Sequence, residues 1–89
     1  MKVVLNRTYG GFSLPADFCA LYNMRKYDYI ARTDPRLVEY VLTHGNRVEF
    51  QYTCLIAVEI PDEVSDWEIN EYDGLESITY VLNGCICHA

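Results

Sequence analysis

The segment RTDPRLVEYVLTHG, residues 32–45, constrains the fold more than any other stretch of the chain. Asp34 stands where a helix N-cap is expected, Pro35 suits the first helical position, and Gly45 supplies a stop signal. Between them, four apolar residues recur at the spacing of one helical face: Leu37, Val38, Val41 and Leu42. We therefore predict a helix over residues 35–44 whose apolar stripe packs into the core.

Short apolar runs on both sides of this helix predict strands. Residues 2–6 (KVVLN) are rich in β-branched side chains, and residues 54–60 alternate apolar positions until Pro61 ends them. Residues 47–52 are expected to lead into that second strand. Residues 66–70 alternate again and are followed by an Asp-Gly turn signal. For residues 75–82 the pattern favours a strand, with a short helix as the alternative.

A second helix is expected after the glycine pair, in SLPADFCALYNMRK. Ser13 is its predicted N-cap, Pro15 lies in its first turn, and apolar residues follow at spacings of three and four, which predicts about three turns. The expected fold class is therefore α+β. We predict one small domain over residues 1–89, with about three to four strands packed with two helices.

The charge of the chain is unevenly distributed. Thirteen acidic residues oppose seven basic ones, and the formal net charge is −6. Eight of the acids lie in residues 59–76, whereas six of the bases lie in residues 7–47. Direct nucleic-acid binding normally needs a basic face, so we do not expect it. An acidic protein can instead cover a basic surface of another protein.

No stretch approaches the roughly 18 apolar residues of a membrane span, and the first residues lack the apolar core of a signal peptide. These features predict a cytoplasmic protein that does not bind membranes. The four cysteines, Cys19, Cys54, Cys85 and Cys87, are then expected to be reduced thiols.

The segment TYGGFS, between the first strand and the following helix, is a candidate anion site. A helix N-terminus offers free N–H donors, and glycines let a phosphate approach the backbone. The candidate ligand-binding residues are Asn6, Arg7, Tyr9, Gly10, Gly11, Phe12 and Ser13, joined by Arg32, Thr33 and Arg36 at the other helix start. Neither a dinucleotide fingerprint nor a P-loop is matched. The alternative is a tight turn with Phe12 packed in the core.

The acidic second half of the chain is a candidate partner surface. Its carboxylates could imitate a phosphate backbone and occupy a basic groove of another protein. The residues proposed for this role are Asp66, Glu68, Glu71, Tyr72 and Asp73. The alternative is a solvated strand face with two acidic turns. The eight tyrosines also predict some exposed aromatic surface, either for a partner or for a homo-oligomer.

Cys85, Cys87 and His88 are three potential zinc ligands within four residues. Structural zinc sites usually pair two such knuckles, and only one imperfect knuckle is present. Thiols at a frayed terminus or on a last strand are therefore the favoured interpretation. We predict no metal, no cofactor and no catalytic residues, because no pair of carboxylates or Cys–His pair carries the signs of an acid, base or nucleophile.

Three segments together carry a resemblance: VVLNRTYGGFSL, RTDPRLVEYV and VEIPDEVSDWEINEYDGLESI. With these segments, in this order, the chain resembles a family of small, uncharacterised proteins encoded by bacteriophages and prophages. The three segments cover about half of the chain. It departs from that family at Pro15, where a polar residue is usual, and at its end, NGCICHA, where the family has a charged tail.

This resemblance implies a phage gene product that acts inside a host bacterium, where small acidic phage proteins often block host defence. The expected function is therefore a non-enzymatic binding protein that counteracts a bacterial host defence by sequestering a nucleotide-like phosphorylated ligand at the Gly-Gly loop. The first alternative is an acidic inhibitor that binds and blocks a host protein. The second is a small enzyme that acts on a nucleotide.

Overall fold

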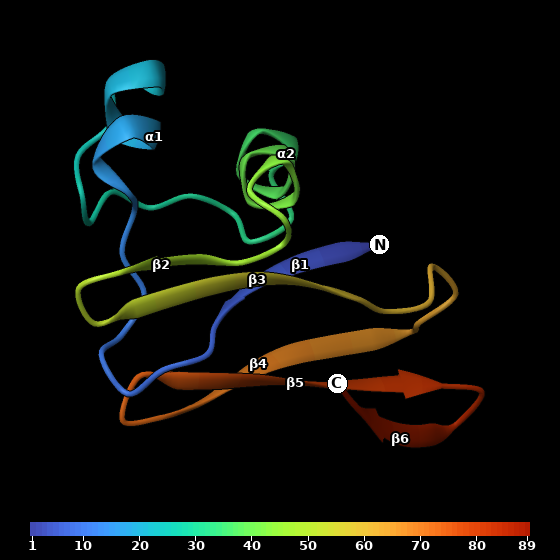
Figure 1. The fold of residues 1–89 in the computed structure, drawn as a ribbon. Coiled ribbons are helices and arrows are strands. Elements are labelled where there is room, and N and C mark those ends of the chain that lie inside the picture. Colours follow the sequence, from blue (N-terminus) through green and yellow to red (C-terminus); the bar gives the residue numbers. More distant parts are fainter.

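Two helices lie on one face of a three-stranded sheet, and a second three-stranded sheet covers the opposite face (Figure 1). The computed structural model describes residues 1–89. In chain order the elements are β1 (Lys2–Asn6), α1 (Ala16–Tyr22), α2 (Pro35–Thr43), β2 (Val48–Phe50), β3 (Thr53–Glu59), β4 (Asp66–Tyr72), β5 (Leu75–Leu82) and β6 (Cys85–His88). The α+β class is confirmed, with two short strands, β2 and β6, in addition to the four longest ones.

The first sheet, which we call sheet A, is antiparallel with the order β1-β3-β2. Val4 pairs with Ala57, and both belong to the core between sheet A and the helices. Val3 and Leu5 point the other way, into the core between the two sheets. Because β1 is buried on both faces, it has a continuous apolar run rather than alternation.

Helix α2 forms nearly as predicted from its local signals. The Asp34 side chain accepts a hydrogen bond from the Arg36 amide at 2.9 Å, and the helix ends at Thr43. Leu37 and Val41 are fully buried. Leu42 is 41% exposed, so its prediction as a core residue was wrong, because the buried stripe is narrower than the apolar pattern.

Helix α1 is shorter than predicted and does not begin at Ser13. It has seven residues, about two turns, and its N-cap is Pro15, whose backbone is still extended. Ser13 is instead buried, and its hydroxyl lies 2.9 Å from that of Thr53 on β3. The Leu14 amide donates to the Lys26 carbonyl oxygen at 2.9 Å. These long-range contacts keep residues 13–14 outside the helix, which overrides the local capping signal.

The second sheet, sheet B, is a meander with the order β4-β5-β6. Its two turns, Asp73-Gly74 and Asn83-Gly84, have positive φ at both residues, which suits two-residue hairpins. The strand prediction for residues 75–82 is confirmed. Trp67, Ile69, Ile78 and Tyr80 share the face of sheet B that packs against sheet A. None of the helices has the length and apolar character needed to cross a membrane.

Candidate functional site

The Gly10-Gly11 pair is packed against two other turns of the chain. A Cβ atom at Gly10 would lie 1.8 Å from the carbonyl oxygen of Tyr52, in the turn between β2 and β3. Gly11 has a φ of 91°. A Cβ atom at Gly74, in the turn between β4 and β5, would lie 2.3 Å from the Gly11 nitrogen. The glycines thus let three backbone segments meet, which supports the tight-turn interpretation of this motif.

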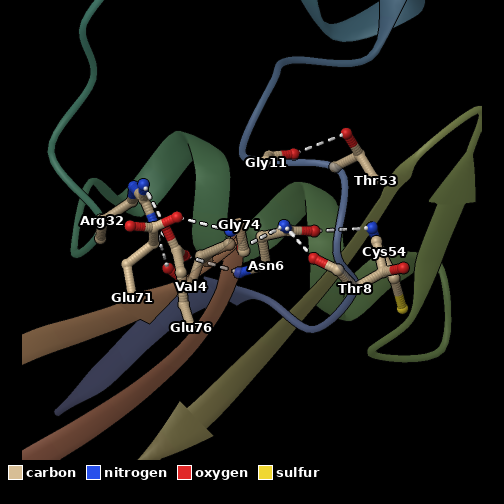
Figure 2. Close-up of polar contacts among 10 residues, drawn as sticks. All are labelled: Val4, Asn6, Thr8, Gly11, Arg32, Thr53, Cys54, Glu71, Gly74 and Glu76. Carbon is tan, nitrogen blue, oxygen red and sulfur yellow. Dashed lines mark hydrogen bonds and ion pairs between the residues drawn. The ribbon is translucent and has the colours of Figure 1, made fainter.

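Arg32 forms a bidentate ion pair with Glu76 beside this turn (Figure 2). Its Nη2 donates to one carboxylate oxygen at 2.9 Å, its Nη1 donates to the other, and the two side chains are only 21% and 7% exposed. The guanidinium also stacks on Phe12, 3.6 Å from the ring centroid. Both the edge and one face of the guanidinium are therefore engaged by the protein itself.

Asn6 is fully buried, and its polar groups bind the protein in three directions (Figure 2). Its Nδ2 donates to the carbonyl oxygens of Gly74 at 2.7 Å and Thr8 at 2.9 Å. Its Oδ1 accepts from the Cys54 amide at 2.9 Å, and its own amide donates to Glu76 at 2.8 Å. Asn6 therefore joins β1 to β3 and to the β4–β5 turn, and its side-chain donors and acceptor are used.

The remaining residues predicted for the Gly-Gly loop are divided between solvent and the core. Tyr9 is 66% exposed, whereas Ser13 is buried against Thr53. The Arg7 amide donates to the carbonyl oxygen of Cys54 at 2.7 Å. The Nε atom of Arg7 is buried and has no hydrogen-bond partner. Among the arginines predicted to bind an anion, Arg7 alone has no ion-pair partner.

The start of α2 already carries a negative charge. Arg36 donates from Nη2 to the Asp34 carboxylate at 2.9 Å and lies over the ring of Tyr22. This hydrogen bond from Arg36 holds the pKa of Asp34 below its usual value. Thr33 is half-buried beside this pair. Because the Asp34 carboxylate caps the helix, the N-terminus of α2 is not free to receive an external anion.

The hollow at the Gly-Gly loop is small. It measures about 60 Å³ and is bordered by residues 10–13, 26–27 and 51–53. Sites for drug-sized ligands usually measure about 300–1,000 Å³. Phe12 stacks on Arg32, and Arg32 and Asn6 share Glu76, so these predicted residues contact the protein itself rather than surround an open space.

The acidic residues proposed for partner binding are only partly brought together. Asp66, Glu68 and Tyr72 share the outer face of β4, which points away from sheet A, and all three are exposed. Glu71 points to the opposite face, and its carboxylate accepts a hydrogen bond from the Gly74 amide. Asp73 lies in the adjoining turn. Three of the five residues therefore form one surface.

We define the outer face of sheet B by the positions that pair in register with these three residues. Across the sheet, Asp66 adjoins Val81, Glu68 adjoins Thr79, and Tyr72 adjoins Leu75. The pairing with β6 adds Ile86, which is 70% exposed, and His88. This face therefore combines carboxylates with exposed apolar and hydroxyl groups.

The predicted exposed aromatic surface is confirmed by five tyrosines. Their exposed fractions lie between 66% and 89%, and they are Tyr9, Tyr27, Tyr29, Tyr52 and Tyr72. By contrast, Tyr40 and Tyr80 are partly buried against the two cores. Only Tyr72 lies on the outer face of sheet B.

The cysteines lie in different surroundings. Cys85 is exposed and Cys87 is half-buried, both on β6, whereas Cys54 is buried in β3. Burial raises the pKa of the Cys19 thiol on α1. No three His, Cys, Asp or Glu side chains in the chain are grouped so that they could hold a metal ion.

Sequence reasoning missed two features. The first is the role of Glu76, which occupies an inward position of β5 on the same face as Ile78 and Tyr80. An acid at an inward position of an alternating strand is a signal of a buried, paired carboxylate. The second is a hollow of about 730 Å³ between α1, α2 and β2, for which the sequence carries no local signal.

Comparison with known proteins supplies no relative for these surfaces. No family model matches the chain, and no curated protein or solved structure matches it.

Proposed function

We propose that this protein is a small non-enzymatic binding protein whose outer face of sheet B associates with a basic surface of another protein and blocks it. The resemblance to phage-encoded proteins suggests that the partner is a host defence protein in the bacterial cytoplasm. Sheet B is suited to this role because nothing else in the chain covers its outer face (Figure 1).

The observation that carries the proposal is that sheet B has no lysine or arginine side chain. No Lys or Arg follows Arg47 in the sequence, so sheet B contains none. Its outer face carries the exposed carboxylates of Asp66 and Glu68 on β4 and the exposed apolar side chain of Ile86 on β6. An anionic face with exposed apolar groups suits a basic protein surface, because charge complementarity guides the encounter and apolar burial adds affinity.

The contacts around the Gly-Gly loop favour this alternative over ligand sequestration. Arg32 is neutralised by Glu76, Asn6 is fully engaged, and the hollow is smaller than a nucleotide requires. Arg7 is the one guanidinium there that could still meet a phosphate. Substitution of a single residue, Arg7, therefore tests whether the protein sequesters a ligand.

The test is a capture experiment with matched variants. The protein is immobilised and exposed to bacterial lysate, and retained proteins are identified by mass spectrometry. The face variant is Asp66→Lys/Glu68→Lys. The control is Glu39→Lys/Glu63→Lys, which makes the same charge change at exposed positions outside sheet B.

We expect one protein to be retained by the wild type and by the control variant, but not by the face variant. Its retention should weaken as salt rises, since exposed charges are screened. Equal retention by the face variant would contradict the proposal. A nucleotide released from the denatured wild type and lost in Arg7→Ala would instead support ligand sequestration.

A further inference from the structure

The two edges of sheet A differ in how their backbone groups are satisfied. At the β1 edge, the Val4 amide donates to the Arg32 carbonyl oxygen at 2.8 Å, and the Val4 carbonyl oxygen accepts from Arg32 Nη1 at 3.3 Å. The Asn6 amide is satisfied by Glu76. The Arg32–Glu76 pair therefore closes this edge, as proteins commonly do to prevent unwanted strand pairing.

The β2 edge is open. Glu49 of β2 lies opposite Cys54 of β3. The amide and carbonyl of Cys54 are bonded to Asn6 and Arg7, on the β1 side. In an antiparallel ladder, two directly opposite residues either exchange both of their main-chain hydrogen bonds or form none with each other. Glu49 and Cys54 form none, so the amide and carbonyl of Glu49 point away from the sheet. They are free to pair with an added strand.

An apolar hollow lies directly beside this open edge. It measures about 730 Å³, within the range of ligand sites, and residues 48–51 form one wall. Residues 14–17 and Cys19 form another, and Tyr40 of α2 and the His44 that caps this helix also line the hollow. Because all three residues of β2, Val48–Phe50, line this wall, the hollow follows the strand edge. An extended segment could therefore bind the backbone of β2 and place side chains in the hollow.

The two faces of β2 determine which side chains such a segment would carry. Val48 and Phe50 belong to the core beneath the helices, so the hollow lies on their face. The Glu49 side chain points to the opposite face and is 63% exposed. Residues directly opposite in a ladder share a face. A residue opposite Glu49 would meet its carboxylate, while the residues on either side would enter the hollow.

A second copy of this chain fits the edge poorly. If β2 paired with its own copy over all three residues, Glu49 would stand opposite Glu49, and like charges in that position are destabilising. Arg47 donates to one Glu49 carboxylate oxygen, Oε1, at 3.1 Å, so a basic residue on the added strand would bind the other oxygen. Asp17 and Lys26 both line the hollow: the Asp17 carboxylate accepts from the Tyr40 hydroxyl, and Lys26 donates to the Gln51 side-chain oxygen at 3.0 Å.

We propose that the β2 edge binds an extended segment of a partner protein with an apolar–basic–apolar pattern, the basic residue opposite Glu49 and the apolar side chains in the hollow between α1 and α2. This is strand addition to a sheet edge, in which main-chain bonds supply affinity and alternate side chains supply specificity. It does not depend on the outer face of sheet B.

The test begins with a random library of short peptides displayed on yeast and selected on the folded wild-type protein, for binders that add to a sheet edge. The most enriched peptide is then synthesised with a fluorophore and titrated by fluorescence anisotropy. We expect the apolar–basic–apolar pattern to be enriched. Binding should shift the Glu49 amide in the protein NMR spectrum and slow its hydrogen exchange.

Two variants separate backbone pairing from charge. Glu49→Pro removes the outward amide, and Glu49→Lys keeps it but reverses the side-chain charge. Each should weaken peptide binding about tenfold or more, because Glu49→Pro leaves a main-chain group of the peptide without its partner and Glu49→Lys places two like charges opposite each other, whereas Glu68→Lys on sheet B should not. NMR spectra of the variants report whether each remains folded, and the Glu49 amide shift in the wild type requires no variant.

Several results would overturn the proposal. These are a selection that yields no binder, peptides without the alternating pattern, and binders that shift the amides of sheet B instead of Glu49. Sedimentation that reveals a dimer whose formation is abolished by Glu49→Pro would assign the edge to a second copy and reject a partner segment.

Discussion

Removal of the Glu76 carboxylate is expected to be one of the most damaging single changes in this protein. The Glu76 side chain is 7% exposed and accepts hydrogen bonds from two Arg32 nitrogens and from the Asn6 amide. Glu76→Ala leaves the Arg32 charge without its partner and the Asn6 amide without its acceptor. Breaking one side of a buried ion pair costs about 3–5 kcal/mol.

That loss is large relative to the whole stability of the chain. A domain of 89 residues has a free energy of unfolding of roughly 4–13 kcal/mol, at about 0.05–0.15 kcal/mol per residue. Each kcal/mol corresponds to about 4–8 °C in Tm at this size. Urea unfolding followed by circular dichroism should therefore show a much earlier transition for Glu76→Ala, or a chain that is already partly unfolded.

A double-mutant cycle built from Arg32→Met, Glu76→Leu and the two changes together isolates the pair. Arg32→Met should also destabilise, because Glu76 keeps only the Asn6 amide as partner. In Arg32→Met/Glu76→Leu no buried charge is left unpaired, so the double variant should lose less than the sum of the two single variants. The Met side chain preserves much of the contact with Phe12.

The Arg47–Glu49 pair is the matched control. It joins two side chains that are 61% and 63% exposed, with the nitrogen and oxygen 3.1 Å apart. Exposed pairs contribute little, so Glu49→Ala should leave the urea midpoint nearly unchanged. If Glu76→Ala shifted the midpoint no more than Glu49→Ala, or if the two changes in the cycle were additive, the assignment of Arg32–Glu76 as a structural pair would be refuted.

Two further predictions follow from the geometry. Gly10→Ala should lower the urea midpoint more than Gly84→Ala, because a Cβ at Gly10 meets the Tyr52 carbonyl, whereas at Gly84 only the φ of 77° is unfavourable. Equal midpoints would contradict this contact. The Tyr40 hydroxyl donates to Asp17 at 2.5 Å and holds the pKa of that carboxyl below its usual 3.8. A lowered folded pKa adds stability above 3.8 that is lost as pH falls through the folded value. The stability difference between wild type and Tyr40→Phe should therefore shrink in acid, and an NMR titration should show a higher pKa for Asp17 in the variant; an unchanged pKa would argue against the bond.

The sequence predicted the elements that depend on local chemistry. Helix α2 was recognisable because its cap, its Asp34-Pro35 start and its Gly45 stop act within a few residues. Strand β1 was recognisable because burial on both faces requires an unbroken apolar run. The Asp73-Gly74 turn followed from the backbone angles that this pair adopts readily.

The candidate site was harder to predict, because its residues come from distant parts of the chain. The sequence placed Arg32 and Asn6 in an anion site, since a free guanidinium near glycines suggests one. It could not show that Glu76, more than forty residues after Arg32, lies against both of them. Likewise, Asp66, Glu68 and Glu71 are equally acidic in sequence, and only the strand register separates the outward residues from Glu71.

By itself, the sequence determined the α+β class, helix α2, the main strands and the concentration of acid in the second half, because each depends on neighbours in the chain. The tertiary structure alone decided that α1 begins at Ala16, that Gly10 and Gly74 allow turns to touch, and that β1 is closed while β2 is open. These features depend on which segments pack together, and packing partners far apart in the chain leave no periodic or capping signal.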